Sequence, residues 1–151
     1  MDGVALGTIV SPYVLAPFFA WIIAQGLKYV FASIKGRTFG SLRQLYLSGS
    51  MPSAHSATVI SFVVVTGFKD GVDSGIFGLA LLFAAVVMYD AVMVRRSSGE
   101  QGNALRGLFT NLKLSPIAPF RTAKGHTPRE VLGGAIVGIF VGLAVYVLAV
   151  A

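Results

Sequence analysis

Four apolar stretches constrain the fold of this chain more than any other feature. They cover residues 11–31, 52–68, 76–94 and 129–151, each close to the roughly 20 residues that a helix needs to cross the hydrocarbon core of a bilayer. The chain is 55% hydrophobic and 12% charged, with a mean hydropathy of +0.78, unlike a soluble domain. The sequence predicts an integral membrane protein, an all-α polytopic bundle of about four transmembrane helices in a single membrane-embedded domain, 1–151.

The second apolar stretch is short and begins with polar side chains. Serine, histidine and threonine side chains at the start of a spanning helix are unfavourable in contact with lipid. The polar residues are Ser53, His55, Ser56 and Thr58. We therefore expect this helix to lie against other helices.

Basic residues are concentrated on one side of the predicted bundle. Eleven of the 12 Lys and Arg residues lie in or beside the first and third connections, whereas the opposite side holds Lys69 with Asp2, Asp70 and Asp73. The positive-inside rule predicts cytoplasmic basic connections and both termini outside, in the cell (inner) membrane. No basic leader precedes the first stretch, so we expect a permanent helix. The net charge of +6 lies in connections, which favours anionic lipid over nucleic acid as a partner.

The chain has two histidines, and each lies at the start of an apolar stretch. His55 opens the second stretch, and His126 immediately precedes the fourth. The alternation of the helices brings both starts to the basic side of the membrane. Since imidazole can act as a nucleophile or a proton donor near neutral pH, this placement suggests one site that contains both histidines.

The two helix starts favour an anionic ligand. Free backbone N–H groups and the helix dipole make a helix N-terminus a natural phosphate site. Two interpretations of Glu130 remain open: it completes a Thr-x-x-Glu capping box with Thr127, or, four residues after His126, it hydrogen-bonds one imidazole nitrogen and leaves the other free to attack phosphorus. The two interpretations are compatible.

Three motifs resemble those of a known family. Residues 51–58 read Met-Pro-Ser-Ala-His-Ser-Ala-Thr, residues 89–101 contain Tyr-Asp-x-x-x-Val-Arg-Arg-x-x-Gly-x-Gln, and residues 125–138 contain Gly-His-Thr-Pro-x-Glu-Val-x-x-Gly-x-x-x-Gly. The first and last resemble the Pro-Ser-Gly-His and His-x-x-x-Asp-Val-x-x-Gly-x-x-x-Gly motifs of the type 2 phosphatidic acid phosphatase superfamily, which includes vanadium-dependent haloperoxidases. Together they are similar to its divergent branch of small membrane proteins, over nearly the whole chain.

The resemblance implies metal-independent hydrolysis of a phosphomonoester or diphosphate through a phosphohistidine intermediate, without a cofactor. By position, His126 would be the nucleophile and Glu130 its orienting carboxylate, where the family has aspartate. His55 would be the general acid, and Ser53 with nearby backbone N–H groups would hold the phosphate. Such a pair needs one neutral and one protonated imidazole, so we expect a bell-shaped pH profile.

The cationic part of the family's site is altered. Of its first motif, Lys-x-x-x-x-x-x-Arg-Pro, only Lys28 carries over, and Phe120 occupies the position of the arginine that precedes the nucleophile. In addition, Ala54 replaces the glycine of the Pro-Ser-Gly-His motif, and its methyl group could crowd the approach of phosphate to the backbone. The candidates to supply the missing charge are Arg95, Arg96 and Arg121.

Structural roles are open for several of these residues. Asp90 could serve the site, but an ion pair with Arg95 or Arg96 is the default expectation for a carboxylate near the end of a span. Lys28 could extend from its helix to the headgroups, and the loop arginines could only set topology. The glycines at 134, 138 and 142 recur every four residues, which is typical of a ridge for close helix packing within the bundle or in a dimer.

The connection between the third and fourth stretches is long. Apolar residues recur there at helical spacing among basic ones, which predicts a short interfacial helix. These residues are Leu105, Leu108, Phe109 and Leu112. The segment could be a lid that admits a lipid headgroup or a surface loop without a gating role.

The sequence thus predicts a membrane phosphatase that acts on a lipid or polyprenyl phosphate or diphosphate. The absence of cysteine excludes disulfides and Cys-ligated zinc, and we expect no metal. Two other classes remain open: a catalytically silent protein that binds or transports lipid phosphates, and a purely structural membrane subunit. The sequence does not fix the oligomeric state, and a homodimer could complete the site.

Overall fold

A computed structural model describes residues 11–34, 51–114 and 125–150, in which every regular element is helical. The elements in chain order are α1 (Pro12–Ile34), α3 (Ala54–Asp70), α4 (Gly75–Tyr89), the π-helical turn η2 (Asp90–Val94), α5 (Arg95–Asn111) and α6 (Pro128–Val150). The predicted all-α bundle is confirmed.

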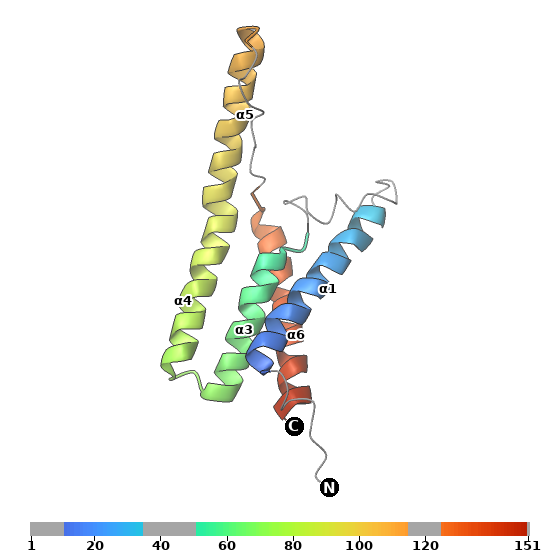
Figure 1. Ribbon diagram of the computed structural model, residues 1–151, viewed down its shortest axis with the longest axis vertical. Coiled ribbons are helices and arrows are strands. Elements are labelled where there is room, and N and C mark those ends of the chain that lie inside the picture. The colour runs from blue at the N-terminus through green and yellow to red at the C-terminus, as the bar shows by residue number, and fades with distance from the viewer. Residues whose placement is uncertain (1–10, 35–50, 115–124, 151) are drawn as a thin grey trace.

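The helices alternate in direction along one long axis. As Figure 1 shows, α1 begins and α6 ends at one end of the bundle, whereas α3 and α6 both begin near the other end, where α1 finishes. The two histidines belong to these two helix starts, since His55 is in the first turn of α3 and His126 directly precedes α6. The fold therefore places both histidines at the same end of the bundle.

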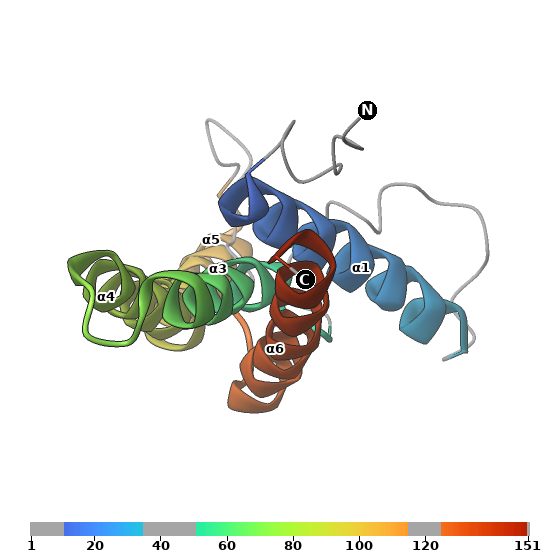
Figure 2. The ribbon, with the colours of Figure 1, turned by 90° about the horizontal axis from the view of Figure 1, so that it is seen from below.

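Helix α3 is the centre of the bundle. It packs against α1, α4 and α6, and in the end-on view of Figure 2 it lies between α4 on one side and α1 and α6 on the other. Its partner α1 presents a buried stripe at four-residue spacing, composed of Pro12, Ala16, Ala20, Ala24 and Lys28. Small side chains let two helices approach closely, which is the usual way that membrane helices pack. At the polar start of α3, Ser53 and Ser56 are buried, as the sequence predicts, whereas His55 is exposed.

The glycine ridge of α6 lies against the backbone of α3. A Cβ atom added to Gly134, Gly138 or Gly142 would lie 2.9 Å or less from the carbonyl oxygen of Ser53, Ala57 or Ser61, respectively. Only glycine permits so close an approach of one backbone to another. The ridge therefore serves packing within the bundle, one of the two roles that its spacing predicts.

Helices α4 and α5 form one continuous rod that extends well beyond the rest of the bundle (Figure 1). The sequence predicts a span that ends at residue 94 and a short helix around Leu105–Leu112, but the helix continues from α4 through η2 without a break. No proline interrupts this region, and the (i, i+4) pair between Arg96 and Glu100 supports the first turns of α5. The helix expected in the third connection therefore exists, and it begins at Arg95.

Three helical segments are long and apolar enough to cross a membrane: Pro12–Ile34, Gly75–Asn111 and Pro128–Ala149. Helix α3 has 17 residues, which gives about 25 Å at 1.5 Å per residue, shorter than a hydrocarbon core of about 30 Å. Helix α3 is therefore shorter than each of the three segments that could cross a membrane.

Candidate active site

The starts of α3 and α6 are joined through backbone groups. The N–H of Ser53 donates to the carbonyl oxygen of Glu130 at 2.9 Å. Ser53 is the N-cap of α3, and its buried hydroxyl accepts the N–H of Ser56 at 3.3 Å and the hydroxyl of Ser56 at 3.0 Å. Capping satisfies one of the free amides in the first helical turn. The two helix starts are therefore joined by a hydrogen bond, and Ser53 caps α3.

The carboxylate of Glu130 performs both functions that the sequence leaves open. Its Oε2 accepts the backbone N–H of Thr127 at 2.9 Å, and the N–H of Glu130 is 3.4 Å from the Thr127 hydroxyl, which completes a capping box. The same Oε2 lies 3.2 Å from Nδ1 of His126. A carboxylate at Nδ1 favours the proton there, so the lone pair is on Nε2. The contact therefore fixes the orientation of the His126 ring, with Nδ1 toward Glu130.

His126 lies in a nearly closed environment. Its surface is 3% exposed, and burial, the largest effect, lowers the pKa of its imidazole below the ordinary value. The hydrogen bond and charge of Glu130 raise this pKa, whereas the charges of Lys28 and Arg95 lower it further. The net direction is downward, so His126 remains neutral at a pH where an ordinary histidine is already protonated.

His55 differs from His126 in exposure. It belongs to the first turn of α3 and is exposed, although it is close enough to His126, Lys28 and Arg95 for their charges to act on it. Both histidines lie at the same end of the bundle, with the imidazole of His126 inside the protein and that of His55 at its surface.

A backbone contact that the sequence does not predict holds His126 against the rod. Within η2, the N–H of Arg95 donates to the carbonyl oxygen of Asp90, five residues earlier, and therefore not to that of Ala91. The carbonyl oxygen of Ala91 accepts the backbone N–H of His126 at 2.9 Å. A π-helical turn changes the partners of local carbonyls, and such turns are frequent at functional sites.

Gly125 is the second feature that fixes the approach to His126. A Cβ atom on this residue would lie 2.5 Å from the backbone nitrogen of Arg96, so the chain passes directly over the rod. Only glycine fits there. In the sequence, the position of Gly125 directly before His126 is the signal of this close contact with the rod.

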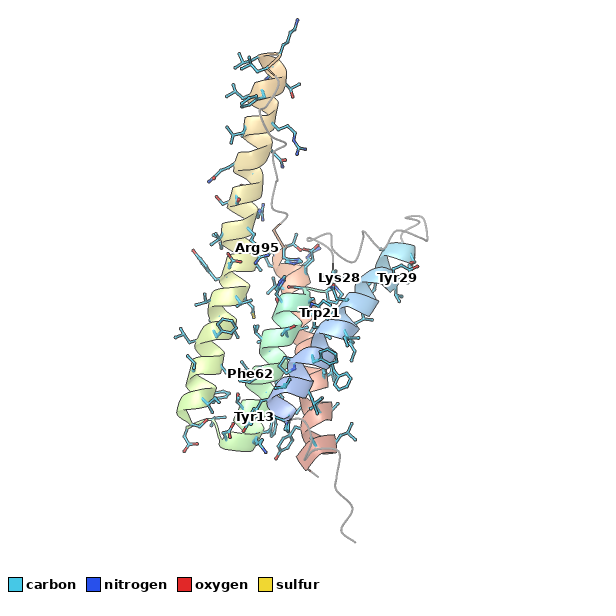
Figure 3. All side chains as sticks on the ribbon, in the orientation of Figure 1. Tyr13, Trp21, Lys28, Tyr29, Phe62 and Arg95 are labelled. Atoms are coloured by element: carbon cyan, nitrogen blue, oxygen red, sulfur yellow. The ribbon has the colours of Figure 1, made fainter. Side chains whose placement is uncertain are left out.

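The candidate cations lie at different places. The buried Lys28 on α1 interacts with the charge of Glu130, and Arg95 pairs with Asp90 at 2.7 Å from Nε to Oδ2. In Figure 3 these two side chains approach the starts of α3 and α6 from opposite sides. Arg96 is exposed and pairs with Glu100 at 3.1 Å, and Arg121 lies outside the described residues. The ion pair between Asp90 and Arg95 is the role that the sequence predicts by default for Asp90.

No group of three or more His, Cys, Asp or Glu side chains that could hold a metal ion occurs in residues 11–34, 51–114 and 125–150. The donors that gather around the histidines are a lysine, an arginine, a hydroxyl and backbone amides. This set matches the chemistry of a phosphate group, which needs hydrogen-bond donors and positive charge.

Glu130→Gln is expected to lower the turnover of any phosphatase activity by about 10- to 100-fold and to leave folding nearly unchanged. The amide oxygen still accepts the N–H of Thr127, so the cap remains, whereas the negative charge beside His126 is lost. Because Glu130 raises the pKa of His126, its loss lowers that pKa, and the acid limb of the rate profile shifts to lower pH. Turnover and thermal unfolding should be measured from pH 5 to 8.

Glu130→Ala is the matched comparison, since it removes the cap together with the charge. It is expected to show the same loss of turnover plus a decrease of about 1 kcal/mol in stability, the typical contribution of a cap. An acid limb that stays in place in Glu130→Gln would contradict the contact with His126 as the basis of the effect.

Two comparisons with known proteins give a consistent result. Residues 9–141 match the model of the Divergent PAP2 family. The chain is also 34% identical, over 110 residues, to the uncharacterized membrane protein YuiD of Bacillus subtilis strain 168; the match covers 64% of this chain and 70% of YuiD. No solved structure matches the chain. With the family match spanning both helix starts and the rod between them, this integral membrane protein belongs to the Divergent PAP2 family.

Proposed function

We propose that the protein is a metal-independent phosphatase of lipid or polyprenyl phosphates, with His126 as nucleophile and His55 as general acid. The observation that carries the proposal is the contact between Nδ1 of His126 and Glu130 at 3.2 Å, which leaves Nε2 of a buried, neutral imidazole free to attack. A nucleophile oriented by a third group is the common arrangement of covalent catalysis.

The reaction has two steps. Nε2 of His126 attacks phosphorus, the phosphorus–oxygen bond to the lipid breaks, and His55 gives its proton to the leaving oxygen. Water then attacks the phosphorus of the phosphohistidine while His55 accepts its proton, the bond between phosphorus and Nε2 of His126 breaks, and inorganic phosphate leaves. The family resemblance supplies the scheme, and the different exposure of the two histidines supports it: the nucleophile is buried, whereas the donor lies where a lipid alcohol could depart.

Lys28, Ser53 and the first amides of α3 are proposed to bind the phosphate, together with an arginine. The buried ammonium of Lys28 is costly without a negative partner, and Glu130, whose charge acts on it, also contacts His126 and Thr127. A phosphate dianion at the helix starts would neutralise the excess. The cationic surroundings of the histidine pair therefore fit an anionic ligand better than a neutral one.

The site is proposed to face the cytoplasm in the cell (inner) membrane, with both termini outside. The basic connections flank the helix starts that carry the histidines. A substrate with an anionic head and an apolar tail is proposed to reach this end laterally, since α3 is shorter than the candidate spans around it.

Purified protein in detergent is expected to release inorganic phosphate from at least one of phosphatidic acid, phosphatidylglycerol phosphate, a polyprenyl phosphate and a polyprenyl diphosphate, with a metal chelator present. The double variant His55→Ala with His126→Ala, prepared identically, measures any contaminating phosphatase. Release by the wild type that does not exceed this blank on any substrate would contradict the proposal.

The altered cationic motif favours a second candidate, a silent protein that binds or transports lipid phosphates. Orthovanadate, a phosphate analogue, separates the candidates when added in a thermal unfolding assay. Stabilisation by vanadate without phosphate release indicates the silent protein, and a wild type that vanadate does not stabilise indicates a structural subunit.

A further inference from the structure

The π-helical turn η2 places one arginine in the histidine site. Asp90 and Arg95 are five residues apart, and their Nε–Oδ2 distance is 2.7 Å. On an α-helix, side chains three or four residues apart face each other, and those five apart point in different directions. A π-helical turn contains more residues per turn, so the ion pair follows from η2.

The same turn links this ion pair to the nucleophile. The carbonyl oxygen of Ala91 accepts the backbone N–H of His126 at 2.9 Å, and Ala91 itself is buried. This hydrogen bond fixes the position of the rod relative to the start of α6, close to the residue from which the Arg95 side chain projects. A one-residue change in the register of the rod would rotate Arg95 by about 100° away from the site.

The bonding pattern of Arg95 leaves suitable donors. Its Nε is occupied by Asp90, whereas the two terminal nitrogens are oriented by that contact and can form the two-pronged hydrogen bonds that guanidinium makes to phosphate. The charge of Arg95 acts on both His55 and His126, and Figure 3 shows Arg95 at the level of the α6 start. Arg96, one residue later, instead pairs with Glu100 in solvent.

We propose that Arg95 is the phosphate-binding guanidinium of this site, held there by Asp90 as a positioning residue through the π-helical turn. It thereby replaces the arginines that the altered family motifs lack. The proposal rests on the proposed function for its ligand, and it selects one arginine among the candidates of the sequence.

Arg95→Ala is expected to raise KM for the hydrolysed lipid phosphate, and the half-saturating concentration of orthovanadate, by about 10- to 100-fold, the loss expected for hydrogen bonds between charged groups. Arg95→Lys should give values between those of Arg95→Ala and the wild type. An ammonium group keeps the charge but cannot pair with Asp90 and also form two parallel hydrogen bonds to a phosphate. Millimolar guanidinium chloride should restore part of the vanadate affinity of Arg95→Ala. The matched control, Arg96→Ala, should change each value by less than about 3-fold.

Asp90→Asn tests the positioning role. It should raise KM and the half-saturating concentration of orthovanadate several-fold in the wild-type background. In the Arg95→Ala background it should have no further effect, because Asp90 acts through the guanidinium of Arg95. Equal effects in both backgrounds would contradict this role, and thermal unfolding without ligand shows whether the fold is retained.

The failure of this proposal can be distinguished from failure of the proposed function. A wild type that binds vanadate, with Arg95→Ala and Arg96→Ala affecting binding equally, overturns only the assignment of Arg95. A wild type that neither binds vanadate nor releases phosphate overturns both.

Discussion

Replacing His126 with alanine is expected to lower phosphate release by at least about a thousandfold on every substrate, since a covalent mechanism loses its nucleophile. The fold should survive, because the N–H that donates to Ala91 belongs to the backbone and Glu130 still caps α6 through Thr127. No phosphohistidine should form in this variant. The measurement is the initial rate together with acid-labile protein-bound phosphate from labelled substrate.

His55→Ala should fail in a different way. A general acid contributes typically 10²- to 10⁴-fold, and it matters most when the leaving group is a poor one such as a lipid alcohol. With an alkyl-tailed nitrophenyl phosphate, whose leaving group needs no proton, His55→Ala should release about one equivalent of nitrophenolate in a burst and then turn over slowly. The slow phase follows because water attack on phosphohistidine lacks its base.

The comparison of the two variants tests the division of roles. A burst with His55→Ala and none with His126→Ala supports it, and a burst in the opposite variant would reverse the assignments. Equal inactivity of both variants on alcohol and nitrophenol leaving groups, in proteins that unfold like the wild type, would contradict the division altogether.

The positions of the histidines could be predicted from the sequence because they depend on chain direction alone. Helices that cross a membrane alternate in direction, so the starts of the second and fourth apolar stretches must lie at the same end. His55 and His126 are attached to those starts, and the structure places them there. The contact between Glu130 and His126 could be predicted for a similar reason, because residues four apart are separated by about one helical turn.

The register of the rod could not be predicted. The segment Asp90–Val94 reads Asp-Ala-Val-Met-Val, without a glycine or proline, and a π-helical turn leaves no mark in such a sequence. The turn nevertheless decides which side chains after it face the bundle. Spacing alone therefore leaves Arg95 and Arg96 as equal candidates, whereas the structure pairs Arg95 with Asp90 and Arg96 with Glu100.

The length of α5 was missed for a related reason. Polar and glycine residues after residue 94 suggested a connection, because hydropathy marks the end of the membrane and not the end of the helix. Local pairs such as Gln101 with Ser97, 3.2 Å apart, and Thr110 with the carbonyl oxygen of Arg106, 2.9 Å apart, accompany a helix outside the bundle. The sequence thus predicts where the apolar part of the rod ends, and the structure shows that the helix continues beyond it.

Gly138→Ala is expected to destabilise the bundle by about 2 kcal/mol or more, as strain in a closely packed core typically does. A Cβ atom at this position would lie 2.5 Å from the carbonyl oxygen of Ala57, and a backbone carbonyl cannot move away as a flexible side chain can. Helix α6 would have to shift from α3 along the whole interface. The added methyl group therefore costs stability, even though alanine is the better helix former.

The matched control is Gly78→Ala on α4. Its added Cβ would meet nothing within 4 Å, so only the gain in helix propensity, up to about 1 kcal/mol, applies. Thermal unfolding of both variants in the same detergent should therefore show a lower midpoint for Gly138→Ala and an equal or higher one for Gly78→Ala. Equal midpoints for the two variants would contradict the close contact between α3 and α6.

Gly138→Ala should also affect the site, because α3 and α6 begin at the histidines. The N–H of Ser53 donates to the carbonyl oxygen of Glu130 across the two helix starts at 2.9 Å, two turns or so from Gly138 along α6. If the helices separate, this bond lengthens and His55 moves relative to His126. Gly138→Ala should therefore lose turnover at temperatures well below its unfolding midpoint, whereas Gly78→Ala should retain it. A variant with lowered stability but unchanged turnover would show that the site tolerates separation of the helices.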